Sequence, residues 1–103
     1  MPLVSLLRTV DREQITVSTS VVRLDIGKRR GGTGPLIERV MITLGPNGPI
    51  RWLADGTAPT ATVGHFAIPT GPEIILNNRN EIEEFRAIRQ STVDGIIEVA
   101  YQR

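Results

Sequence analysis

The segment Arg39-Val-Met-Ile-Thr-Leu-Gly-Pro-Asn-Gly-Pro-Ile-Arg-Trp-Leu-Ala54 contains the two clearest strand patterns of the chain. In residues 39–44, and again in residues 50–54, every second side chain is apolar, as in a strand that is buried on one face. The Gly-Pro-Asn-Gly-Pro sequence of residues 45–49 separates the two runs, and its asparagine–glycine pair tolerates positive φ. We therefore predict two antiparallel strands that are joined as a hairpin.

The same pattern of short strands and turns continues through the rest of the chain. Glycine and proline interrupt it at short intervals, and no long crossover helix separates the strands, which is typical of an antiparallel β-sandwich or small barrel of about seven strands. We expect at most one helical turn, at Glu81–Glu84, which Asn80 would cap and which would lead into a strand at Phe85–Arg89. The predicted organisation is an N-terminal arm over residues 1–13 and one all-β domain over residues 14–103.

Composition restricts the classes of partner. Twelve basic and eleven acidic side chains give a net charge of +1, and only four residues are aromatic. A general polyanion binder needs a basic face and a single-strand binder needs stacking aromatics, so we expect no specific nucleic acid. The absence of cysteine excludes disulfides and thiolate metal sites. No apolar run approaches the ~20 residues that span a bilayer, so we expect no membrane partner either.

No group of residues in the sequence favours catalysis. His65 is the only histidine, which is too few for an imidazole metal site, and no Gly-x-Ser-x-Gly motif accompanies it. Glu81, Glu83 and Glu84 lie among arginines, which is typical of a solvated ion-pair surface. The run Lys28–Pro35 is basic and rich in glycine, but its lysine precedes the glycines, unlike a P-loop, so we expect a mobile loop. We predict that the protein is not an enzyme, with no cofactor and no catalytic or metal-binding residue.

Several predicted strands carry apolar side chains on both faces, which a sheet with one wet face does not need. One interpretation is that scattered exposed apolar residues are ordinary. The other is that neighbouring copies bury the second face, that the apolar N-terminus lies on an adjacent copy, and that the basic loop contacts an acidic neighbour or sugar phosphates. On this second interpretation we predict a subunit interface that includes Leu3, Val4, Leu6, Leu7, Arg29, Arg30, Met41, Leu53, Ile75 and Ile96.

The segment Arg51-Trp-Leu-Ala-Asp-Gly-Thr-Ala-Pro-Thr-Ala-Thr-Val-Gly-His-Phe66 resembles part of the small virion proteins of tailed bacteriophages, in which a strand runs into Asp-Gly-Thr-x-Pro-Thr and a Gly-His turn. The order continues with Glu73-Ile-Ile-Leu, Phe85-Arg-Ala-Ile-Arg89 and Asp94-Gly-Ile-Ile-Glu-Val-Ala-Tyr101, so the resemblance covers roughly residues 14–102. It implies a β-sandwich structural protein and brings no catalytic residues. The Lys28–Pro35 loop and the apolar N-terminus match no motif of that family, which leaves the position in the particle open.

From the resemblance and the two-faced strands we expect a capsid decoration (cement) protein, made in the host cytoplasm and carried in the virion. Its partners would be the major capsid protein or other virion subunits, and further copies of itself, with a trimer favoured. A tail or neck component stays open as an alternative. So does a carbohydrate-binding module for host recognition, in which Trp52 and Tyr101 would stack on sugar rings with Asp55 and Asn78 as hydrogen-bond partners. An exposed Trp52 would favour that module.

Overall fold

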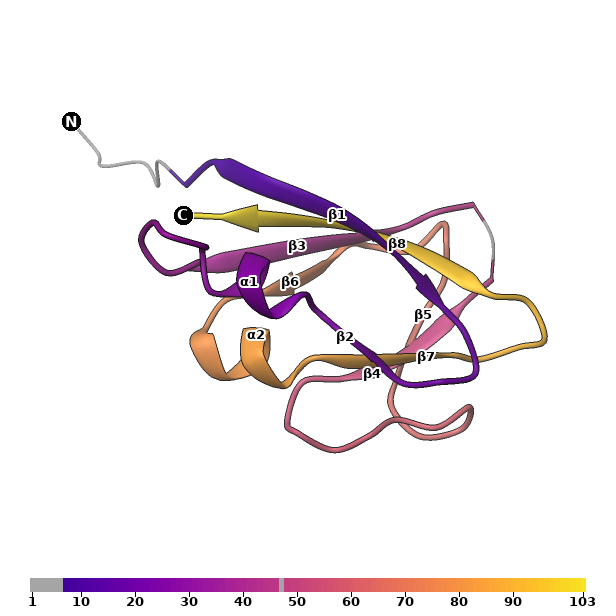
Figure 1. Ribbon diagram of the computed structural model, residues 1–103. Helices are drawn as coiled ribbons and strands as arrows, with labels where there is room; N and C mark the ends of the chain where they lie inside the picture. Colours follow the sequence, from indigo (N-terminus) through magenta and orange to yellow (C-terminus); the bar gives the residue numbers. More distant parts are fainter. Residues whose placement is uncertain (1–6, 47) are drawn as a thin grey trace.

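The computed structural model describes residues 7–46 and 48–103, which form a sandwich of two antiparallel sheets (Figure 1). Sheet A has the strand order β1-β8-β3-β6, and sheet B has the order β2-β7-β4-β5. The all-β sandwich that the sequence predicts is confirmed. The strands of sheet A are β1 (Thr9–Val17), β3 (Arg39–Leu44), β6 (Ile74–Leu76) and β8 (Gly95–Gln102). Those of sheet B are β2 (Val22–Arg23), β4 (Ile50–Leu53), β5 (His65–Ala67) and β7 (Arg86–Arg89).

The core lies between the sheets and is built from alternate residues of the strands. In β8, for example, Ile97, Val99 and Tyr101 are buried while Glu98 is exposed. β8 and β3 are the inner strands of sheet A, and β7 and β4 are the inner strands of sheet B. The two sheets cover the core from opposite sides. The buried hydrophobic side chains are those of Val17, Leu24, Ile37, Val40, Ile42, Ile50, Ile74, Leu76, Ile82, Phe85, Ala87, Ile97, Val99 and Tyr101.

The predicted hairpin over residues 39–54 is wrong, although both of its strands exist. β3 pairs with β6 and β8 in sheet A, whereas β4 pairs with β5 and β7 in sheet B. The link between β3 and β4 therefore crosses from one layer to the other, a distance of about 10 Å. Alternation reports only which face of a strand is buried, and these two strands bury their apolar faces against the same core from opposite sides. A hairpin and a crossing between sheets produce the same pattern.

The predicted N-terminal arm over residues 1–13 is too long, because β1 begins at Thr9. The polar Asp11 and Glu13 alternate with more exposed neighbours along this part of β1. They are bonded to residues that lie far away in the sequence, so the first half of the strand has no apolar alternation to reveal it. Residues 1–6 lie outside the described part of the chain.

Two short helices lie at the same end of the sandwich (Figure 1), α1 (Ile26–Arg29) and α2 (Arg79–Glu84). The predicted helical turn before a strand is confirmed by α2, which leads into β7. Its cap is Asn78 and not Asn80, because the Oδ1 atom of Asn78 accepts the backbone N–H of Glu81 at 2.9 Å. The single buried side chain of α2, Ile82, anchors it to the core.

The other helix, α1, corrects the expectation of at most one helical turn and of a loop that starts at Lys28. Asp25 caps α1 by accepting the backbone N–H of Lys28 at 2.9 Å. A helix of four residues is too short to show an apolar period, so only the capping aspartate was available as a signal. The consequence is that Arg29 points into the protein and is buried.

Candidate interaction surfaces

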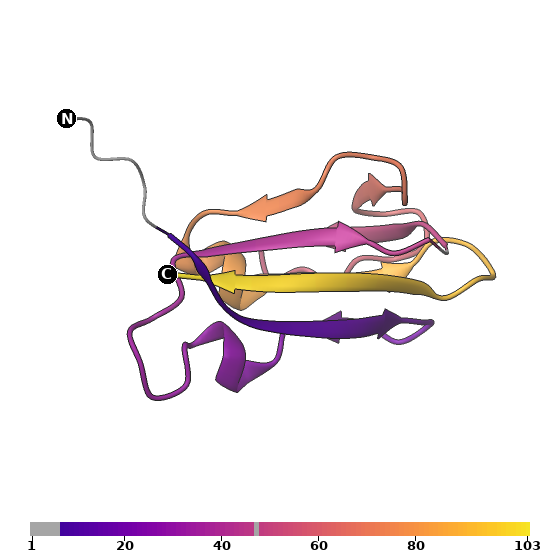
Figure 2. The same cartoon turned by 90° about the horizontal axis from the view of Figure 1, so that it is seen from above.

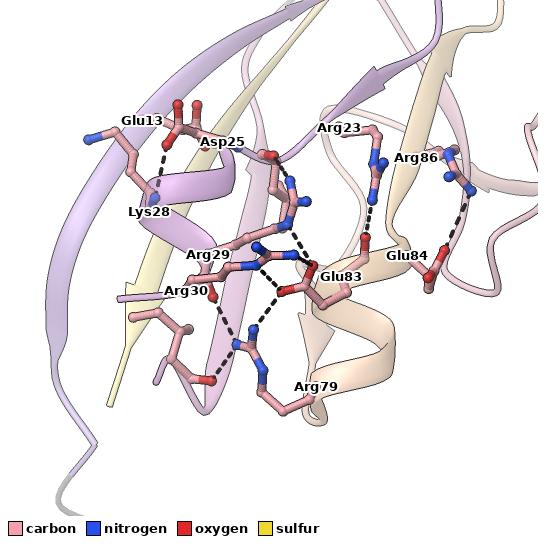
Figure 3. A network of polar contacts seen from close by, with 12 residues as sticks. Glu13, Arg23, Asp25, Lys28, Arg29, Arg30, Arg79, Glu83, Glu84 and Arg86 are labelled. Atoms are coloured by element: carbon pink, nitrogen blue, oxygen red, sulfur yellow. Dashed lines mark hydrogen bonds and ion pairs between the residues drawn. The ribbon is translucent and has the colours of Figure 1, made fainter. Parts of the chain in front are cut away.

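Three arginines surround Glu83 at the end of the sandwich where the helices lie (Figure 3). Arg29 and Arg30 each place Nε 3.1 Å from an oxygen of the Glu83 carboxylate, and Arg79 places Nη2 at 2.7 Å. Arg29 also donates to the carbonyl of Leu24 at 2.5 Å. Since these residues come from α1, from its C-cap and from α2, the cluster ties the two helices together.

The electrostatics of this cluster favour the ionised carboxylate strongly. The Arg30 guanidinium is the largest cause that lowers the pKa of Glu83 to about 2, and Arg29 lowers it further, against partial burial that raises it. Arg79 extends the network to the backbone by donating to the carbonyls of Arg29 at 2.8 Å and of Ile37 at 2.9 Å. The donors of these arginines bind the chain itself, which makes the cluster a structural element.

Two of the predicted interface residues belong to this cluster. Arg29 is only 5% exposed, so its prediction as a subunit contact is wrong. The reason is that the helical turn α1 directs its side chain toward Glu83 and Leu24. The side chain of Arg30 is 54% exposed but binds Glu83. Arg30 can therefore contact another subunit only while it keeps its ion pair with Glu83.

A second polar contact joins the neighbouring strands β1 and β8 of sheet A to the N-cap of α1. The hydroxyl of Tyr101 donates to the Glu13 carboxylate, and the backbone N–H of Asp25 donates to the same oxygen at 3.0 Å. Burial of the Tyr101 side chain, and after it the Glu13 carboxylate, raises the pKa of the phenol. Tyr101 is therefore a neutral core residue whose hydroxyl is satisfied inside the fold.

The constellation predicted for a carbohydrate-binding module is not assembled. Tyr101 is fully buried and cannot stack on a sugar ring. Asn78 uses its side-chain oxygen to cap α2, and Asp55 uses Oδ1 to accept the N–H of Thr57 at 2.9 Å. Trp52 is half-buried and packs against the core.

An apolar trough of about 480 Å³ opens at the edge of the sandwich where β5 and β6 lie. Three large apolar side chains at its rim are exposed: 52% for Phe66, 40% for Ile68 and 45% for Ile75. Trp52 forms part of the wall, with its ring centroid 4.7 Å from that of His65. Glu73 is the one carboxylate among the residues described as lining it. We call this feature the edge trough.

Arg51 packs against Phe66, which is one of the residues that line the edge trough. Its guanidinium lies 4.9 Å from the centroid of the Phe66 ring, within the range of a cation–π contact. It also donates to the carbonyl of Gly64 at 3.1 Å. Phe66 and Ile68 were not among the predicted interface residues, because the run from His65 to Ile68 is too short to show which of its side chains face outward.

The remaining predicted interface residues do not form one patch. Met41 lies opposite Ile75 in the β3–β6 register, on the outer face of sheet A. Ile96 lies on the same face of β8 but toward the other end of the strand. Leu53 pairs with Arg86 in sheet B, on the far side of the molecule. Leu7 is half-buried, whereas Leu3, Val4 and Leu6 lie outside the described residues. Ile75 is thus the predicted contact that the structure places at the edge trough.

Within residues 7–46 and 48–103, no group of three or more histidine, aspartate or glutamate side chains is arranged to hold a metal ion. No helix in this described part has the length and apolar character to cross a membrane. Comparisons of the chain with protein-family models, with curated proteins and with solved structures found no match. The resemblance to tailed-phage virion proteins therefore stays a prediction from the sequence.

Proposed function

We propose that this protein is a structural component of a tailed-bacteriophage virion, a capsid decoration protein that works by binding neighbouring subunits. The observation that carries the proposal is the edge trough. Its rim residues Phe66, Ile68 and Ile75 are exposed, although the sandwich already has a complete apolar core without them. Exposed apolar side chains that gather at one hollow are typical of a protein–protein contact.

The architecture also fits a structural role. Each sheet ends at the trough, in β5 or in β6, and neither strand has a second partner strand within the described residues. An unpaired edge of this kind can pair with a segment from another chain. A closed oligomer would cover every trough at once, and we favour a trimer among the closed symmetries. The virion setting comes from the Asp55-Gly-Thr-x-Pro-Thr60 resemblance in the sequence.

Capsid binding tests the proposal directly. Mixed with empty capsids of the parent phage, the protein is expected to co-sediment at a fixed stoichiometry. Ile68→Ser is expected to weaken binding at least tenfold, because burying a side chain of this size contributes about 1.5–3 kcal/mol. Leu36→Ser is the matched control, since Leu36 is 57% exposed and lies outside the residues that line the trough.

Three outcomes would count against the decoration function. A monomer that ignores capsids contradicts it, and equal losses for the Ile68 and Leu36 variants contradict the role of the trough. Binding to purified tails in place of capsids would move the protein to the tail or neck of the particle.

A further inference from the structure

We infer that the N-terminal segment Leu3–Leu7 of one copy occupies the edge trough of another copy. This inference rests on the homo-oligomer of the proposed function and names the two surfaces that form its contact. The segment reads Leu-Val-Ser-Leu-Leu and is followed by Arg8. The residues that line the trough all belong to the sandwich. Residues 3–6 lie outside the described part of the chain.

The chemistry of the two surfaces matches. Apolar side chains dominate both the segment and the trough rim, where Phe66, Ile68 and Ile75 are exposed. Glu73 lines the trough, is itself exposed, and has no ion pair among residues 7–46 and 48–103. Arg8 is exposed at the base of the segment. An apolar segment that ends in an arginine is therefore complementary to this trough in both character and charge.

Geometry places the contact between copies and not within one. Figure 2 shows β1, which continues the segment, and β6 along opposite edges of sheet A. Three interstrand spacings separate them, about 14 Å across the sheet. In the register, Thr9 is level with Arg39, and Ile74 is level with Ile42, so Leu7 lies about 17 Å from the trough along the strands.

These offsets combine to roughly 22 Å between Leu7 and the trough. The four residues from Leu7 back to Leu3 span at most about 14 Å when fully extended. Leu3 therefore cannot reach the trough of its own copy. A neighbouring copy has no such restriction. The segment of one copy and the trough of another can form this contact reciprocally in a dimer or in sequence around a closed ring.

Strand addition describes how the segment would bind. An extended segment beside an edge strand gains main-chain hydrogen bonds, while alternate side chains enter the apolar hollow. Beside β6, the segment would cover Ile75 and place its apolar side chains over the trough. Arg8 would then leave the trough on the side of Glu73.

Cysteine cross-linking tests the inference, because the chain contains no cysteine of its own. Tagged Leu6→Cys protein is mixed with untagged Ile68→Cys protein, and a mild oxidant is added. A disulfide-linked heterodimer, identified by its mass, is expected in several-fold excess over the same mixture with Val21→Cys. Val21 is 38% exposed in the turn between β1 and β2, at the opposite edge of the sandwich. The Ile68 and Val21 variants thus present similarly accessible thiols.

Equal heterodimer yields from the two mixtures, or no heterodimer in either, would overturn the inference. The result is independent of capsid binding, which is measured separately on the unmodified protein. Capsid binding without cross-linking removes the segment exchange and keeps the decoration function. Cross-linking without capsid binding removes the decoration function and keeps the segment exchange.

Discussion

Replacing Glu83 with glutamine is expected to lower the free energy of unfolding by about 3 kcal/mol at neutral pH. The substitution leaves the buried Arg29 without a charged partner and removes the ion pairs that link α1 and its C-cap to α2. The pKa argues for the same magnitude, since a value held at about 2 against an ordinary 4.5 corresponds to about 3 kcal/mol when the carboxylate is ionised. Urea unfolding followed by circular dichroism measures the difference.

Glu84→Gln is the matched control for this experiment. Glu84 is the next residue of the same helix, but its side chain is 43% exposed and lies 3.7 Å from Arg86. An ion pair of that kind contributes about 0–1 kcal/mol. Equal losses for the two variants would show that the arginines around Glu83 add nothing beyond a surface pair.

The contribution of Glu83 also has a defined pH dependence. Because folding lowers the pKa of this carboxyl, the stabilisation is complete above the ordinary value of 4.5 and is lost as the pH falls toward about 2. The difference in free energy of unfolding between the wild type and Glu83→Gln is therefore expected to be constant at neutral pH. It is expected to disappear between about pH 5 and pH 2. Other carboxylates such as Asp11 also have a lowered pKa, so the comparison with the variant isolates the part that belongs to Glu83. A gap that stays constant down to pH 2 would contradict this origin.

The fold class could be predicted from the sequence because strand periodicity is a local property. The alternation in residues 39–44 and 50–54 identified β3 and β4, and the segment Glu81–Arg89 was correctly divided into a helical turn and a strand. The pairing of the strands could not be predicted in the same way. Whether β3 pairs with β4 or with β8 depends on contacts between segments more than fifty residues apart, and each arrangement buries the same side chains.

Interface residues were harder to predict than the fold, for two physical reasons. A charged side chain such as Arg29 looks like a surface residue until the structure shows that it is buried beside the Glu83 carboxylate. An apolar side chain in a short strand, such as Phe66, looks like core until the position of that strand at the sheet edge is known. Ile75 was correctly expected to face outward because Ile74 and Leu76, its neighbours in the strand, are both apolar.

Substitutions of the two phenylalanines are expected to distinguish effects on folding from effects on assembly. Phe85 is 1% exposed and stacks on Trp52 with 5.8 Å between the ring centroids. Phe85→Ala is expected to cost about 4 kcal/mol of stability, from lost burial and from the cavity left behind. Phe66 is 52% exposed, so Phe66→Ala is expected to cost less than about 1 kcal/mol, mainly from the contact with Arg51.

Trp52 is the only tryptophan, so its fluorescence reports on both substitutions without ambiguity. Phe85→Ala should change the emission of the folded protein, because it removes the buried ring that stacks on the indole. Phe66→Ala should leave the unfolding curve nearly unchanged and still weaken binding to capsids, because its side chain lies at the rim of the edge trough and outside the core. If Phe66→Ala unfolded the protein as severely as Phe85→Ala, the exposed ring would be a structural requirement. The exposure of Phe66 would then no longer support the edge trough as a binding surface.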